Sequence, residues 1–237
     1  MHDLIRLGQV EPVRKRLSEA TLGLLGCTIA LSDDEWRAPS LLPGWSRAHV
    51  ATHVARNADA LRGLVQEVIA GGWKTLYASE AERMEAIERG AERSGLELQI
   101  DLDTSAGELS SVMEQVDDWA QPVRLPFGVL PLASVAVARL HEVTLHHIDL
   151  GCSYTHEQLD PVPARWLLQW AVDRLATRPG LPAVDVESDS GLTASLGDVG
   201  ERRHVRGTDA ALWGWVTGRS AGTDLDGVDG HAWPPMP

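Results

Sequence analysis

The chain has 237 residues, enough to bury a sizeable core in one large domain or two small ones. Its apolar and charged fractions, 43% and 23%, are those of an ordinary globular protein, so long disordered stretches are not expected. The formal net charge of -13 disfavours nucleic-acid and membrane partners, because phosphate backbones and anionic lipids repel an acidic protein. An anionic small-molecule substrate is still compatible with this net charge, since local arginines or a metal ion can outweigh it at a binding site.

Helical spacing of apolar residues and capping residues predict several helices in the first two thirds of the chain. Ser46 fits as an N-cap, and Ser79 and Ser105 each begin a capping-box pattern. The expected helices are 10–31, 47–69, 80–93, 106–119 and 133–150, with Gly151 closing the last. The four long ones suggest an antiparallel four-helix bundle with inward-facing side chains that can build a site.

Beyond Gly151 the pattern changes to short apolar runs separated by glycine and aspartate. We expect helices at 161–177 and 209–217, and strands at 183–187, 192–196 and 203–206. The predicted fold class is therefore α+β. A helical bundle at residues 1–153 precedes a small α/β domain at residues 154–237.

Candidate metal ligands lie on two of the predicted helices. Glu142 and His146 are spaced i, i+4 on a mainly apolar face, so they are expected to lie one turn apart and inward. A metal ion would compensate this buried pair, and so would a simple Glu–His hydrogen bond. His53 lies on an apolar stripe of the second helix, where the alternative is a core histidine bonded to a carbonyl or to Asn57.

The other histidines are expected to be solvated or to support the ligands, with His49, one turn before His53, as a rival ligand. This group comprises His49, His141 and His147. His146 and His147 should not both face the core, because adjacent helical residues diverge by about 100°. Two histidines and one glutamate leave a coordination position open, as in catalytic zinc sites, and favour an incoming thiolate or hydroxide. Iron or nickel is an alternative metal.

Three motifs together resemble one known family. The segments are Pro43-Gly44-Trp45-Ser46, then His53-Val54-Ala55-Arg56-Asn57-Ala58, then Glu142-Val143-x-x-His146-x-x-Asp149-Leu150. In this order and spacing they are similar to the mycothiol-dependent maleylpyruvate isomerases, whose N-terminal part is a DinB-like bundle. The resemblance covers nearly the whole chain. It implies that His53, Glu142 and His146 bind Zn2+ and that mycothiol is the thiol cosubstrate.

The resemblance also implies that Arg83 and Arg219 reach the active site and bind the carboxylates of a small-molecule substrate. Guanidinium groups suit this task because they bind carboxylates in a fork and stay charged; the alternative is two surface arginines in ordinary salt bridges. The implied reaction is cis–trans isomerisation of maleylpyruvate to fumarylpyruvate by reversible addition of the thiolate. The chain departs from the family at His147, where a small residue is usual, and this puts the pocket wall and the substrate in doubt.

Cys27 and Cys152 form no CxxC pair, and the N-terminus lacks the apolar core of a signal peptide, so we expect a cytoplasmic protein. Three rival functions stay open. They are a mycothiol S-transferase on the same site, a non-catalytic helical-bundle binding protein, and a metal hydrolase, which ranks lower because the helices offer no evident general base.

Overall fold

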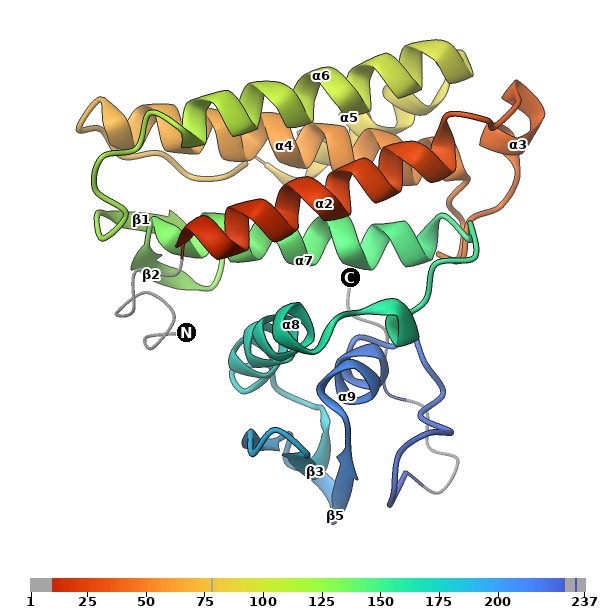
Figure 1. Ribbon diagram of the computed structural model, residues 1–237, viewed down its shortest axis with the longest axis vertical. Coiled ribbons are helices and arrows are strands. Elements are labelled where there is room, and N and C mark those ends of the chain that lie inside the picture. The colour runs from red at the N-terminus through yellow and green to blue at the C-terminus, as the bar shows by residue number, and fades with distance from the viewer. Residues whose placement is uncertain (1–9, 78, 229–232, 234–237) are drawn as a thin grey trace. The chain divides into compact units, whose positions relative to one another are not determined.

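The computed structural model describes residues 10–77, 79–228 and 233, which form two compact units (Figure 1). The first unit runs to Cys152 and the second begins at Ser153, next to the boundary expected after residue 153. The first unit is mainly helical and the second contains a small sheet, so the α+β class is confirmed. Among the described residues, no helix is both long and apolar enough to cross a bilayer.

The first unit is a bundle of four long helices, with a fifth and a sixth short helix and one hairpin attached (Figure 1). Its elements are α2 (Val10–Thr28), α3 (Asp33–Arg37), α4 (Arg47–Ile69), α5 (Glu80–Ala91), α6 (Gly95–Met113), β1 (Pro122–Leu125), β2 (Gly128–Pro131) and α7 (Ala133–Asp149). Helix α4 packs against both α6 and α7, while α2 packs mainly against α7. The hairpin β1–β2 and the helix α3 were not expected from the sequence.

The bundle is not the simple antiparallel one that was expected. Ion pairs join Arg56 to Asp101 and Arg62 to Glu108, so α4 and α6 run in the same direction. The cause is the long connection after α4, which carries α5 and returns the chain to the end where α4 began (Figure 1).

Helix α6 begins eleven residues before its expected start. Its N-cap is Ser94, whose hydroxyl accepts from the Glu97 amide while the Glu97 side chain accepts from the Ser94 amide. Ser105, the expected N-cap, is buried inside the helix and donates to the Leu102 carbonyl. The helix also ends at Met113 rather than Trp119. Both serines carry the same local signature, so burial of the apolar residues between them decides which one starts the helix.

Helix α4 matches its predicted bounds. Ser46 caps it by accepting from the His49 amide, and the His49 ring accepts from the Ser46 amide in return. This reciprocal capping satisfies donors that a helix start would otherwise leave unpaired. The inward face of α4 carries His53 and Asn57, which are each 5% exposed.

Helix α7 is buried on nearly every side, because α2 covers one flank and α4 the other. Only Ala138 and Glu142 are partly exposed. His141 and His147 were expected to be solvated or to support the ligands. His141 is fully buried and His147 is 7% exposed, so the first of these alternatives is wrong for both. His146 and His147 were also expected not to face the core together. This is wrong, because α4 packs on the His146 side of α7 and α2 on the His147 side, so both rings are buried. The His147 ring packs beside Gly23 of α2, where an added Cβ would lie 3.5 Å from it.

The second unit combines a three-stranded sheet with two helices, which confirms the small α/β fold. Its elements are η1 (His156–Gln158), α8 (Pro161–Leu175), β3 (Pro182–Ser188), β4 (Thr193–Leu196), β5 (Val199–Gly207) and α9 (Asp209–Val216). The strand order is β4-β3-β5, with β4 antiparallel and β5 parallel to β3. Helices α8 and α9 pack on each other.

Candidate metal centre

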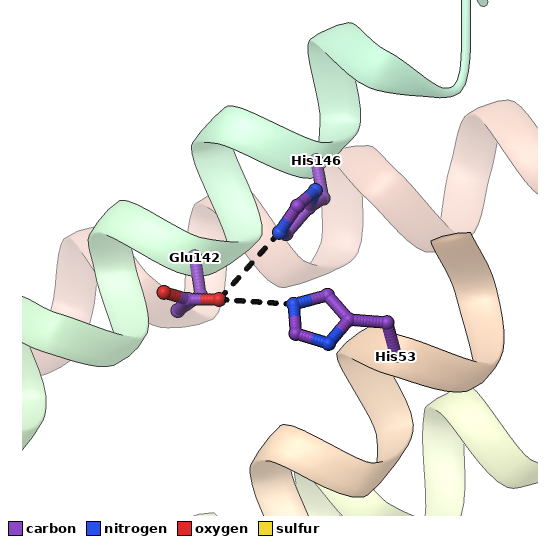
Figure 2. Close-up of side chains that lie close together, drawn as sticks. All are labelled: His53, Glu142 and His146. Carbon is purple, nitrogen blue, oxygen red and sulfur yellow. Dashed lines mark hydrogen bonds and ion pairs between the residues drawn. The ribbon is translucent and has the colours of Figure 1, made fainter. Parts of the chain in front are cut away.

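Three side chains from two helices of the bundle converge in its interior (Figure 2). The Nε2 atom of His53, on α4, lies 3.2 Å from the Oε2 atom of Glu142, on α7. The Nε2 atom of His146 lies 3.5 Å from the same oxygen. The three potential ligand atoms all lie within 4.8 Å of one another, so the structure brings together the three residues that the sequence singled out.

The geometry follows from helix spacing and helix packing. Glu142 and His146 share one face of α7 because they are four residues apart. Contact between α4 and α7 then brings His53 opposite them, with its ring edge-on to the His146 ring and the ring centroids 4.5 Å apart. The Trp45 ring is tilted against the His53 ring, and the two ring centroids lie 5.7 Å apart.

Charge in this cluster is concentrated on Glu142. Burial by itself raises the pKa of the Glu142 carboxyl, but hydrogen bonds from His146 and His53 outweigh burial and hold the pKa well below its usual range. Burial lowers the pKa of His53 to about 4, and the neighbouring His146 adds to this effect. Glu142 is therefore an anion at neutral pH and His53 is a neutral imidazole, the forms in which both bind metals.

A further carboxylate orients His146. Asp149 is 1% exposed, and its Oδ2 atom accepts from the Nδ1 atom of His146 at 2.9 Å. Burial lowers the pKa of His146, but the hydrogen bonds to Asp149 and then Glu142 outweigh it, and the pKa is raised. Asp149 holds the Nδ1 side of the ring in this way, so the Nε2 atom of His146 faces the cluster, the orientation that metal-binding histidines have. This role of Asp149 was not predicted from the sequence, although its i+3 spacing from His146 was a usable signal.

Comparison with known proteins places this cluster in a family. The sequence profile of the mycothiol maleylpyruvate isomerase N-terminal domain matches residues 17–151, more than half of the chain. The chain belongs to this family. All three convergent residues lie within the matched region, and Arg219 lies beyond it.

Two solved structures share the fold of this family member. The mycothiol-dependent maleylpyruvate isomerase matches with a TM-score of 0.86 at 22% sequence identity. A histidine-to-alanine mutant of that isomerase matches with the same TM-score at 21% identity. Each match covers 96% of this chain and 97% of the other chain, which shows a common fold for both units. No curated protein sequence matches the chain significantly.

The cluster of this isomerase-family chain fits a tetrahedral metal site. Ligand atoms about 2.0–2.2 Å from a zinc ion lie roughly 3.3–3.6 Å from one another in a tetrahedron. The two separations from Glu142 Oε2, 3.2 and 3.5 Å, are close to this spacing, and all three ligand atoms lie within 4.8 Å of one another. One carboxylate and two imidazoles are also a ligand set that zinc accepts, and they leave a fourth position open.

Arg83 lies beside the cluster, on α5. Its Nη2 atom is 3.2 Å from the Nδ1 atom of His53, and its Nη1 atom donates to Glu80 at 2.6 Å. Its guanidinium also lies over the Tyr77 ring, 5.5 Å from the centroid. Asn57, considered as a partner for His53, bonds to Arg139 and Tyr77 instead.

Two other residues predicted for the site, His49 and Arg219, are not among the three convergent residues. His49 caps α4 and lies 3.2 Å from Glu88, and it is not in the convergent group, so its rival assignment as a ligand finds no support. Arg219 belongs to the second unit and follows α9. Its amide donates to the Gly214 carbonyl and its Nη1 atom to the Thr217 carbonyl, at 2.8 and 2.6 Å.

Proposed function

We propose that the protein is a zinc- and thiol-dependent isomerase that converts maleylpyruvate to fumarylpyruvate with mycothiol as its thiol. The observation that carries the proposal is the convergence of His53, Glu142 and His146 at spacings that suit a tetrahedral ion. Membership of the family adds the thiol and the substrate, because the related structures carry both in their names.

In this proposal His53, Glu142 and His146 hold the ion, and Asp149 keeps His146 oriented. The bound ion supplies Lewis acidity, which lowers the pKa of a cosubstrate thiol so that the nucleophilic thiolate is present at neutral pH. The protein ligands carry one negative charge, so the site keeps a net positive charge that attracts an anionic sulfur. Burial of the cluster strengthens this attraction, since the effective dielectric constant inside a protein is low.

The two arginines are assigned to the carboxylates of the substrate. Arg83 is well placed for this role because it already lies against His53 and is partly exposed, with 20% of its side chain open. A histidine that binds an ion through Nε2 carries its proton on Nδ1, and that proton repels a guanidinium donor. With His53 holding an ion, Arg83 would therefore not be bonded to Nδ1 and would be available to bind an anion. We keep the same role for Arg219 as part of the proposal, tested by Arg219→Gln.

Isomerisation is distinguished from S-transfer by the fate of the thiol. Purified protein is mixed with maleylpyruvate in the presence and absence of mycothiol, before and after chelation of metals. We expect fumarylpyruvate to form only with thiol and metal, and the free thiol concentration to stay constant. Stoichiometric thiol loss with another electrophile would instead support a mycothiol S-transferase.

Histidine variants on α4 provide the matched control. His53→Ala should lose the ion and the activity, whereas His49→Ala, one helical turn away, should keep both. Metal analysis of the purified variants also distinguishes zinc from iron or nickel. A folded protein that binds no divalent ion and is equally insensitive to both substitutions would support a non-catalytic bundle.

The proposed partners are a small carboxylate substrate and a low-molecular-weight thiol, and the proposed location is the cytoplasm.

A further inference from the structure

Tyr77 lies beside the candidate metal centre but is not one of its ligands. It precedes α5, is partly buried, and packs its ring under the guanidinium of Arg83, which in turn contacts His53. Burial raises the pKa of Tyr77; the Asn57 hydrogen bond and Arg83 oppose this shift and the Glu142 charge adds to it, so the pKa stays raised. The Tyr77 hydroxyl is therefore protonated at neutral pH and has one hydrogen to donate.

The buried Arg139 determines which groups donate and which accept in the hydrogen bonds around Tyr77. Arg139 is 2% exposed, and its Nη1 atom donates to the Asn57 side-chain oxygen and to the Val54 carbonyl, each at 2.8 Å. A guanidinium has donors and no acceptor, so the atom of Asn57 that faces it must be the amide oxygen. The orientation of the Asn57 amide is therefore determined by chemistry.

The other end of that amide faces Tyr77. The Nδ2 atom of Asn57 lies 3.4 Å from the Tyr77 hydroxyl oxygen, and an amide nitrogen is only a donor. The Tyr77 oxygen accepts from Asn57, and Arg83, its other hydrogen-bonding neighbour among the described residues, also has only donors; the Glu142 carboxylate acts on Tyr77 through its charge and not through a hydrogen bond. The Tyr77 hydrogen can be donated to neither of them. It remains available for an acceptor that enters the site.

We propose that Tyr77 is a catalytic residue that donates its hydroxyl hydrogen bond to the ketone oxygen conjugated with the substrate double bond, and that Asn57 and Arg139 are positioning residues. The inference rests on the proposed function. When the thiolate sulfur bonds to carbon, the π-electron pair of the double bond moves onto the ketone oxygen as an enolate. The hydroxyl of Tyr77 stabilises that negative charge without giving up its proton. After rotation about the single bond, the pair returns, the carbon–sulfur bond breaks and the thiolate leaves, so no proton or electron is consumed.

Removal of this hydroxyl tests the proposal directly. Tyr77→Phe keeps the ring that packs under Arg83 and removes only the donor. We expect kcat for maleylpyruvate isomerisation to fall by about 100-fold, the usual effect of losing one donor to a developing oxyanion, with little change in KM or zinc content. Tyr154→Phe is the matched control, because the chain has only two tyrosines and Tyr154 belongs to the second unit.

Replacement of the Asn57 Nδ2 donor by an acceptor oxygen tests the positioning role of Asn57. In Asn57→Asp the new carboxylate still accepts from Arg139, which preserves the buried interaction, but it also accepts the Tyr77 hydrogen. The hydroxyl is then turned away from the substrate. We expect a fall in kcat similar to that of Tyr77→Phe, and no further fall when the two substitutions are combined. Independent structural damage would instead give losses that multiply.

The outcomes separate this inference from the proposed function. An active wild-type protein with a normal Tyr77→Phe variant would overturn the role of Tyr77 and leave the isomerase proposal in place. Loss of zinc from Tyr77→Phe would also overturn it, since the hydroxyl would then support the fold of the site. Multiplying losses in the double variant would overturn the positioning role of Asn57. A wild-type protein that isomerises no maleylpyruvate with thiol and zinc present would overturn both proposals.

Discussion

Replacement of Asp149 by asparagine should weaken zinc binding by about 10- to 100-fold while the bundle stays folded. Asp149 is 1% exposed, and its carboxylate holds the Nδ1 proton of His146 at 2.9 Å. Asparagine has nearly the same shape and keeps one acceptor oxygen, but it lacks the negative charge. The His146 imidazole then becomes a weaker base and is held less firmly, so its interaction with zinc is weaker.

The magnitude follows from these contacts. A tenfold change in a dissociation constant equals about 1.4 kcal/mol at 25 °C, so the expected loss is about 1.4–2.7 kcal/mol. The bond is short, charge-assisted and removed from water, which favours the upper half of this range. The retained acceptor oxygen of asparagine favours the lower half. We therefore expect a value near the middle, well above the error of a titration.

Competition with a chromophoric chelator at pH 7.5 measures the zinc dissociation constant of each protein. Asp34→Asn is the matched control, because the side chain of Asp34 is fully exposed on α3. Thermal unfolding of the metal-free proteins shows whether Asp149→Asn is folded. Equal zinc affinity in wild type and a folded Asp149→Asn would refute the reasoning, since His146 would then not depend on this carboxylate or would not bind the ion.

Three further results are expected. Glu142→Gln should lower zinc affinity by at least about 100-fold, measured by metal analysis after dialysis, because the only anionic ligand of the cluster is lost; full zinc retention would contradict the assignment. Burial lowers the pKa of His147 from 6.5 to about 4, so the unfolded chain binds a proton more readily than the folded one. The contribution of neutral His147 to stability is therefore complete above pH 6.5 and is lost as the pH falls toward 4. Wild type should thus lose about 2 kcal/mol relative to His147→Gln between pH 7.5 and pH 5 in urea titrations of metal-free protein, and parallel pH profiles would disprove this. Gly95→Ala should destabilise the protein by about 1–3 kcal/mol, because its Cβ would lie 2.5 Å from Trp36, whereas Gly107→Ala on the same helix meets nothing within 4 Å and should be neutral or stabilising; equal effects of the two substitutions in urea unfolding would count against this packing.

Local signals located most of the helices, because capping and apolar periodicity act over a few residues. The start of α6 shows where such signals fail. Ser94 and Ser105 carry equivalent capping patterns, and only the burial of Leu98 and Leu102 against the rest of the bundle selects Ser94. The parallel direction of α4 and α6 depends on the route of the intervening chain, which has no local signature.

The features of the metal cluster also fall into those that local sequence determines and those that depend on the tertiary structure. The sequence by itself determined that Glu142 and His146 share a helix face, because four residues make about one helical turn. It also determined the family, through three motifs in order, and the acidic charge that disfavours nucleic acid. Only the tertiary structure decided that His53 meets that face and that Asp149 and Arg83 contact the two imidazoles. It also buried α7 on both flanks, which corrected the expected exposure of His147, because contacts between distant segments depend on helix packing and not on spacing along the chain.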